Sequence, residues 1–256
     1  MKMSQVALQC YTIRDHCRTA PEFAESMRRA RAIGYETVQI SGVGPIPPSE
    51  IYTIANGEGL QICATHEPGI DIIDRPEQVV ETLAALHCKL TAYPWPHISL
   101  ETIADVDRFA EGLNRSGAVL KAAGMQLCFH NHDMEFRKLD GKTVLERLYE
   151  KTDPNLVMAE LDTYWVHAGG GDVVSWCTRM VGRLPMIHLK DYAMRAKERQ
   201  PIFAPLGEGN LEFPRIISVA EQSGCQWFIV EQDSGFDDAF EAIATSLRYL
   251  REHVAS

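Results

Sequence analysis

The feature that most constrains the fold of this chain is a regular alternation of short apolar runs with longer amphipathic runs. Eight short runs have the length and apolar character of buried strands. They cover residues 5–11, 36–41, 60–66, 89–93, 125–132, 156–162, 184–190 and 227–233. The run at 89–93 is the weakest, because Lys89 and Thr91 dilute it. Strands that alternate with helices in this way are typical of a parallel sheet.

A helical pattern follows every predicted strand. The predicted helices cover residues 21–34, 47–59, 75–86, 99–124, 141–153, 171–182, 212–224 and 237–254. Thr19 is a suitable N-cap for the first helix, and four helices end at a glycine: Gly34, Gly124, Gly182 and Gly224. Eight strand–helix units in 256 residues predict a single (β/α)8 TIM barrel over residues 1–256. A doubly wound sheet is the alternative, but "CYTIRDH" after the first strand is no phosphate loop.

Composition narrows the classes of partner and the cellular compartment. The formal net charge of −10 disfavours nucleic acid and gives no polybasic membrane signal. Seven widely spaced cysteines without a CxxC motif are typical of reduced thiols, and the N-terminal residues lack the apolar core of a signal peptide. No run is long enough to cross a membrane. We therefore expect a cytoplasmic protein.

Chemically capable side chains gather at the predicted carboxyl ends of the strands, where the active site of such a barrel lies. These residues are Tyr11, His66, His130, His132, Asp162, His188, Lys190, Glu231 and Asp233. Residues two apart on a strand share a face, so His130 and His132 should point the same way, as should Glu160 and Asp162. Such groups are costly to bury without partners. A shared divalent cation would supply one partner for all of them.

Two carboxylates and two imidazoles form a ligand set of mixed hardness. Such a set favours Mn(II) or Co(II), with Zn(II) and Mg(II) as alternatives. "GEG" at 207–209 resembles a phosphate loop but is too short to be specific, so we predict a tight turn there.

Six motifs spread along the chain are similar to those of the xylose-isomerase-like TIM barrels, the group of sugar phosphate isomerases, epimerases and inosose dehydratase. The motifs are "LQCYTIRD" at 8–15, "CFHNHDMEF" at 128–136, "AELDTYWVHAGGGD" at 159–172, "IHLKD" at 187–191, "LGEGNLEF" at 206–213 and "VEQD" at 230–233. The resemblance covers essentially the whole chain. It implies one divalent metal held by residues at the ends of strands five to eight.

Three ligands carry over from the resemblance: Asp162, His188 and Glu231. The fourth position differs, since the family's epimerases have a glutamate where this chain has His130. His130 then binds the metal, acts as the base, or does neither while His132 is the base. Glu160 lies one step deeper on the strand face that it shares with Asp162, so we expect it to orient a ligand or hold a proton.

The resemblance and the predicted site imply proton abstraction next to a carbonyl. Our first hypothesis is a sugar isomerase or epimerase that works through a metal-stabilised enediolate. The alternative is a dehydratase or lyase that eliminates a β-leaving group from the same intermediate. A non-catalytic sugar-binding barrel is the second alternative.

Roles are assigned to these residues as follows. The metal ligands are His130, Asp162, His188 and Glu231, and the expected catalytic residues are His132, Glu231, Lys190 and Glu160. The residues expected to bind the sugar or keto-sugar are Tyr11, His66, Trp165 and Glu135, the last closing over the substrate from the loop after strand five.

Two surface features leave alternatives open. Arg195, Lys197 and Arg199, after strand seven, either select a phosphate or form a solvated loop face. The aromatic run "YPWPHI" at 93–98 is either a pocket wall or a contact surface of a homo-oligomer.

Overall fold

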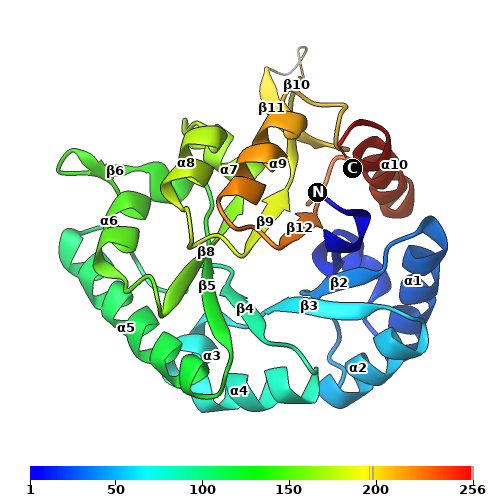
Figure 1. Ribbon diagram of the computed structural model, residues 1–256, viewed down its shortest axis with the longest axis horizontal. Coiled ribbons are helices and arrows are strands. Elements are labelled where there is room, and N and C mark those ends of the chain that lie inside the picture. Colours follow the sequence, from blue (N-terminus) through cyan, green and yellow to red (C-terminus); the bar gives the residue numbers. More distant parts are fainter. Residues whose placement is uncertain (196, 198, 255–256) are drawn as a thin grey trace.

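The computed structural model describes residues 1–195, 197 and 199–254, and it shows the predicted closed barrel of eight parallel strands (Figure 1). The strands are β1 (Val6–Gln9), β2 (Thr37–Ile40), β3 (Gln61–His66), β4 (Leu90–Tyr93), β5 (Gln126–His130), β8 (Val157–Asp162), β9 (Met186–Leu189) and β12 (Trp227–Val230). Strand β1 pairs with both β2 and β12, which closes the barrel. All eight predicted strands are confirmed, including the weakest, β4.

Helices surround the strands (Figure 1). Those in the predicted positions are α1 (Ala20–Ile33), α2 (Pro48–Gly57), α4 (Pro76–Ala85), α5 (Ile103–Ala122), α6 (Val144–Lys151), α8 (Val173–Arg179), α9 (Phe213–Gln222) and α10 (Ala239–His253). Two short helices were not predicted: α3 (Gly69–Asp74) and α7 (Thr163–Ala168). Each lies in the connection after a strand, β3 or β8, so each adds to the carboxyl-end face of the barrel.

Local sequence signals place the helix ends. Thr19 caps α1 as predicted, with its side chain accepting from the Glu22 backbone N–H while Glu22 reaches back to the cap. The glycines predicted to stop helices all have positive φ, as at Gly34 with φ 114°. These ends set the length of each connection and thereby the position of the next strand.

Strands β3, β4 and β8 end at the predicted residue, whereas β1, β2, β5, β9 and β12 end one to three residues earlier than predicted. Strand β1 gives way to a 3₁₀ segment (Cys10–His16), and β12 ends at Val230. Tyr11, His132, Lys190 and Glu231 therefore lie just beyond the strands rather than inside them. Their side chains converge on the barrel mouth from the connections that follow the strands.

Two antiparallel hairpins interrupt the strand–helix alternation. One is β6 (Lys138–Leu139) with β7 (Lys142–Thr143), and the other is β10 (Asp191–Arg195) with β11 (Gln200–Ala204). The second hairpin follows β9 directly and projects away from the barrel (Figure 1).

The barrel interior has an apolar part and a polar part. A cluster of mostly small buried residues fills the apolar part: Ala7, Cys63, Ala64, Leu90, Ala92, Cys128, Met186 and Ile229. Buried polar side chains, among them Gln9, Gln39, Glu160 and His188, occupy the rest. Larger apolar side chains pack between the strands and the helices. The seven cysteines are free and buried.

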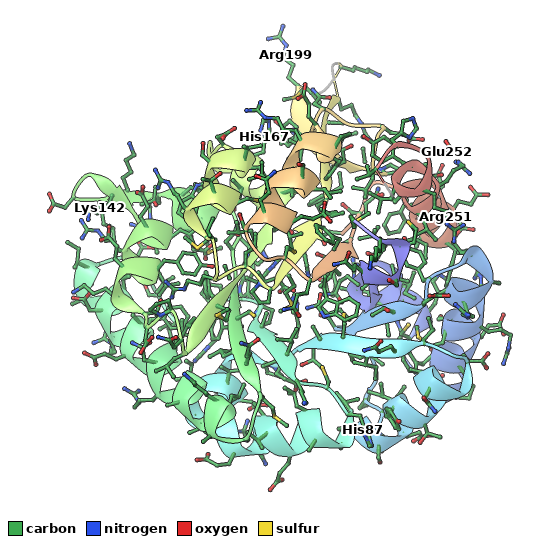
Figure 2. All side chains as sticks on the ribbon, in the orientation of Figure 1. His87, Lys142, His167, Arg199, Arg251 and Glu252 are labelled. Atoms are coloured by element: carbon green, nitrogen blue, oxygen red, sulfur yellow. The ribbon has the colours of Figure 1, made fainter. Side chains whose placement is uncertain are left out.

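Most charged side chains lie on the outside, where Figure 2 shows Lys142, Arg199, Arg251 and Glu252 at the periphery. His87 and His167 are exposed there as well. Within the described residues, the helices are all too short or too polar to span a membrane.

Candidate functional site

A continuous network of buried polar side chains crosses the barrel at the carboxyl ends of its strands. Gln9 Nε2 donates to Gln39 Oε1 at 2.9 Å, and Gln39 Nε2 donates to Glu160 Oε1 at 2.7 Å. The His188 Nε2 atom lies 2.7 Å from Gln39 Oε1. These side chains come from β1, β2, β8 and β9. Alternate residues of a strand point into the barrel, and each of these four stands at such a position.

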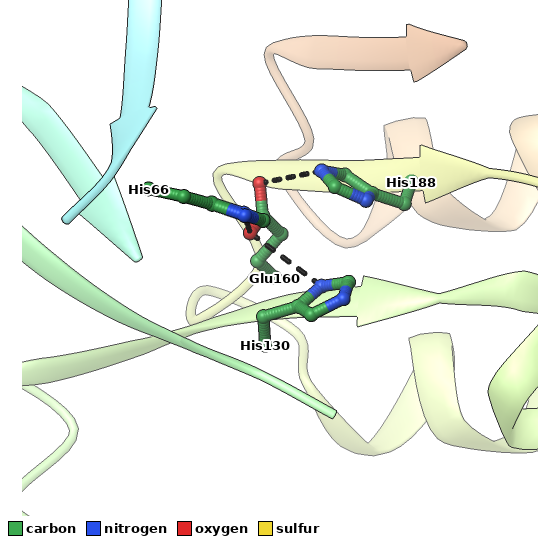
Figure 3. Close-up of side chains that lie close together, drawn as sticks. All are labelled: His66, His130, Glu160 and His188. Atoms are coloured by element: carbon green, nitrogen blue, oxygen red, sulfur yellow. Dashed lines mark hydrogen bonds and ion pairs between the residues drawn. The ribbon is translucent and has the colours of Figure 1, made fainter. Parts of the chain in front are cut away.

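Glu160 is the centre of one cluster within this network (Figure 3). Its carboxylate lies 2.7 Å from His66 Nε2, 3.1 Å from His188 Nε2 and 3.6 Å from His130 Nδ1. Burial alone would raise the pKa of Glu160, but the imidazoles of His188 and His66 outweigh it and lower that pKa well below its usual range. Glu160 is therefore a carboxylate surrounded by three imidazoles.

Asp162 and Glu231 form a second cluster on the other side of His188. His188 Nδ1 lies 2.6 Å from Glu231 Oε2 and 3.8 Å from Asp162 Oδ2, and His130 Nε2 lies 3.9 Å from the same Asp162 oxygen. Burial disfavours the charge on His188, but Glu160 and Glu231 raise its pKa to about 10. His188 thus presents one nitrogen to each cluster. Without a bound metal, its ring is a positively charged imidazolium.

Lys190 extends the second cluster. Its Nζ lies 2.9 Å from Glu231 Oε2, 3.1 Å from Asp162 Oδ2 and 3.0 Å from Asp233 Oδ2. Burial works against the ammonium charge, but these carboxylates outweigh it and raise the pKa of Lys190. Lys190 remains charged although it is only 2% exposed.

Two imidazoles from β5 and its following loop face the same space. The rings of His130 and His132 are 4.9 Å apart, which confirms that they point inward together. Burial lowers the pKa of both, with Lys190 contributing at His132, whose pKa falls to about 3. The Nδ1 atoms of both rings are buried without a hydrogen bond. These are two neutral imidazoles with unused nitrogen atoms.

A cavity of about 360 Å³ opens above these clusters. Its lining residues are Tyr11, Ser41, His66, Pro94, Trp95, His130, His132, Trp165, Lys190, Glu231 and Asp233. This volume fits a small ligand with a few placed polar groups. Larger hollows of about 410, 580 and 610 Å³ lie elsewhere on the described part of the molecule, but none of them is lined by a predicted site residue. The chemistry therefore points to the cavity at the barrel mouth.

The structure brings together most of the residues predicted from the sequence. Those that line the cavity are Tyr11, His66, His130, His132, Trp165, Lys190 and Glu231. Glu160, Asp162 and His188 are fully buried next to it and contact the lining residues.

Glu135 is placed differently from the position expected for a residue that closes over a substrate. It is fully buried outside the cavity lining, where its Oε2 accepts from the His132 backbone N–H at 2.6 Å. The contact fixes the loop that carries His132.

Four residues with contacts in the site had no role assigned from the sequence: Gln39, Ser41, Trp95 and Asp233. Gln39, Ser41 and Asp233 lie at or near the ends of predicted strands, so their position in the sequence could have placed them in the site. Trp95 belongs to the run "YPWPHI", and its place in the cavity wall, with Pro94, supports the pocket-wall alternative.

Two overlapping groups of side chains could hold a metal ion: His66, His130, Glu160 and His188, or Asp162, His188 and Glu231. The residues present fit a divalent cation. Four buried or half-buried carboxylates (Glu160, Asp162, Glu231 and Asp233) face one lysine and one imidazolium. Asp162 Oδ2 is buried, and the ammonium near it is Lys190 Nζ at 3.1 Å, which Glu231 and Asp233 share. A divalent cation would supply the missing positive charge.

The fold and the cluster define a class of protein: a (β/α)8 barrel whose ionisable residues gather at the carboxyl ends of the strands, the usual place of the active site in such barrels. Residues 27–253 match the model of the family described as xylose isomerase-like TIM barrel, and the chain belongs to that family.

The individual proteins that are similar to this chain have low sequence identity to it. An inosose dehydratase from Clostridium perfringens is 26% identical over 159 residues, which cover 56% of this chain and 53% of the relative. The match thus spans about half the length of that relative. The solved structure of a sugar phosphate isomerase/epimerase from Parabacteroides distasonis superposes with a TM-score of 0.84 at 22% identity, covering 98% of this chain and 94% of that one.

A third similar protein was solved with a metal. A xylose isomerase-like TIM barrel protein from Mycobacterium smegmatis, in complex with magnesium, superposes with a TM-score of 0.74 at 14% identity. The superposition covers 98% of this chain and 97% of that protein. At this identity the likeness concerns the fold.

Proposed function

We propose that this protein is a divalent-metal-dependent enzyme that removes a proton next to the carbonyl group of a sugar or keto-sugar. The single observation that carries the proposal is the convergence of neutral imidazoles, a buried lysine and paired carboxylates on one cavity of about 360 Å³. An acid, a base and a cation-binding set within one cavity are the groups that enolisation of a carbonyl compound needs.

We assign the metal to Asp162, His188, Glu231 and His130. In this arrangement His188 Nδ1 and His130 Nε2 face the metal, while their other nitrogens face Glu160. Glu160 and Gln39 then hold the imidazoles in place, as outer carboxylates and amides commonly do. The bound cation would polarise a substrate carbonyl and offset the negative charge that develops there. Mn(II) and Co(II) suit the mixed nitrogen and oxygen donors.

His132 is the base in this proposal. Its ring is neutral and lines the cavity, so a substrate bound there can reach it. Burial and the Lys190 charge weaken it as a base. If Lys190 donates a proton to a substrate oxygen, its positive charge is lost and the pKa of His132 rises as His132 takes up the substrate proton.

Return of the proton to another carbon or face gives an isomerase or epimerase, the first reaction we propose. One observation favours elimination as a second candidate. The Lys190 ammonium borders the cavity and could protonate a departing hydroxyl, which would make the enzyme a dehydratase. Similarity to an inosose dehydratase supports this candidate.

The test is incubation of the Mn(II)-loaded protein in deuterated water with ketoses, 3-keto sugars and inososes. An isomerase or epimerase yields a deuterated product of unchanged composition, whereas a dehydratase yields a product lighter by one water. A protein that binds a sugar but incorporates no deuterium from any of these compounds would instead be a non-catalytic sugar-binding barrel.

A further inference from the structure

The cavity wall offers no unpaired positive charge to an anionic substrate. Among the described residues that line it, Lys190 carries the one permanent cation. Its Nζ is already within 3.1 Å of three carboxylates, of which Glu231 and Asp233 also line the cavity. These carboxylates would repel a phosphate or carboxylate group placed there, and the Lys190 ammonium is already paired with them.

The guanidinium of Arg14 contacts two residues of the cavity wall from outside the lining. Arg14 donates through Nη1 to the Tyr11 carbonyl at 2.7 Å and through Nη2 to the Asp233 carbonyl at 3.1 Å. It also lies over the Tyr11 ring, 4.1 Å from its centroid. Arg14 is not among the residues that line the cavity, so it supports the wall through Tyr11 and Asp233 and does not face a ligand there.

The glycine turn after β11 binds an anion that belongs to the chain itself. The backbone N–H groups of Gly207 and Gly209 donate to Asp191 Oδ2 at 2.9 and 3.0 Å, and that of Leu211 donates to Oδ1 at 3.1 Å. A β-carbon at Gly209 would lie 2.3 Å from Asp191 Oδ1, so the carboxylate fills the turn. The amides that could cradle a phosphate are therefore occupied.

The basic residues after β9 do not supply the missing charge either. Lys197 and Arg199 belong to the connection between β10 and β11 and do not line the cavity, and Figure 2 shows Arg199 pointing outward from its tip. The solvated-face alternative is the one this geometry favours.

Aromatic rings dominate the open part of the cavity instead. Trp95 is 54% exposed, and its ring meets the edge of His132 at a centroid distance of 4.6 Å. Tyr11 and Trp165 line the same cavity. An exposed aromatic face beside polar groups suits a ligand with both C–H faces and hydroxyl groups, which is the surface of an uncharged sugar.

We infer that the cavity selects an uncharged sugar, without phosphate or carboxylate groups, whose C–H face packs on Trp95. This inference rests on the proposed function and names its substrate class. This preference for an uncharged sugar would distinguish the chain from proteins of similar fold that act on phosphorylated or carboxylated compounds.

Matched substrates test the inference. The Mn(II)-loaded protein is assayed for deuterium incorporation with D-fructose against D-fructose 6-phosphate, D-tagatose against D-tagatose 6-phosphate, and an inosose against 3-dehydroshikimate. We expect the uncharged member of a reactive pair to have a kcat/KM about 100-fold higher, because like charges disfavour the anion. Equal or higher kcat/KM for the charged member would overturn the inference and leave the proposed function standing. Absence of turnover with all six compounds would overturn the proposed function, and the inference with it.

Two matched pairs of variants separate charge from size and test the stacking surface. Ser41 lines the cavity, so Ser41→Arg should raise the relative kcat/KM for the phosphorylated member about tenfold over Ser41→Gln. Equal effects of the two variants would mean that size excludes the phosphate, which contradicts the inference. Trp95→Ala should raise KM for the uncharged sugar about tenfold with little change in kcat, and Trp95→Phe should restore it. An unchanged KM in Trp95→Ala would remove the stacking role.

Discussion

At the scale of single residues, the function of the site depends on where each nitrogen and oxygen points. His188 illustrates this, because its two ring nitrogens face different carboxylates: Nδ1 faces Glu231 and Nε2 faces Glu160. A residue that faces two clusters can bind a metal with one nitrogen while the other fixes the orientation of the ring. The two candidate metal groups can therefore be distinguished by substitution of one carboxylate at a time.

We predict that Asp162→Asn lowers the affinity for Mn(II) at least 100-fold, whereas Glu160→Gln lowers it only about 10–100-fold. The reason is that Asp162 would touch the metal, while Glu160 would act through the imidazoles of His188 and His130. Titration calorimetry of the metal-free protein measures both affinities. The reverse order would show that the metal lies in the Glu160 cluster.

Glu135 leads to a prediction about pH. Burial raises its pKa from 4.5 to about 7, and its Oε1 atom has no hydrogen bond. The folded state thus holds this proton more tightly than the unfolded state, so the stability linked to Glu135 is full below pH 4.5 and is lost as the pH rises to 7.

We expect Glu135→Gln to become more stable than the parent protein as the pH rises from 5 to 8, by up to about 3 kcal/mol. The glutamine can still accept from the His132 backbone N–H. Urea unfolding at several pH values measures this difference in the free energy of unfolding. A difference that does not vary with pH would contradict the raised pKa.

At the scale of elements, the connection between β9 and α9 is the part that departs most from a simple strand–loop–helix unit. It contains the β10–β11 hairpin and the glycine turn, and Asp191 joins the two through its carboxylate. Because Asp191 follows Lys190 directly, the same contact positions the backbone that carries the Lys190 ammonium.

We predict that Asp191→Ala destabilises the protein by about 1–3 kcal/mol, since it leaves partly buried backbone donors without their acceptor. Hydrogen exchange should accelerate at the amides of Gly207, Gly209 and Leu211, which donate to Asp191. The control is Asp140→Asn, at an aspartate whose side chain is 89% exposed. Unchanged exchange at these three amides would show that the turn holds its shape without the carboxylate.

At the scale of the whole molecule, the barrel brings carboxylates from β8 and from the end of β12 against His188 of β9. Neighbouring strands are locked in register, for example Asp162 beside His188. A ligand that joins these residues therefore ties together several strands of the sheet. Binding to the folded state alone raises the stability of the entire chain.

We expect Mn(II) at 100 times its Kd to stabilise the fold by about 2.7 kcal/mol. For a chain of this size that corresponds to a rise in Tm of roughly 5–10 °C, which a chelator should reverse. Differential scanning calorimetry measures the shift, and Asp162→Asn is the matched control that should show almost none. The metal assignment would be wrong if both proteins responded equally.

The sequence by itself determined the barrel, because the alternation of strand and helix patterns is a local property of each segment. It also indicated most of the cavity lining, since side chains at the carboxyl ends of barrel strands must converge. Only the tertiary structure decided how those side chains pair. Glu160 meets His66 across 94 positions of the chain, Trp95 meets His132, and Asp191 occupies the glycine turn. Such contacts depend on distances between strands and on loop conformations beyond the strand ends, which no local pattern encodes.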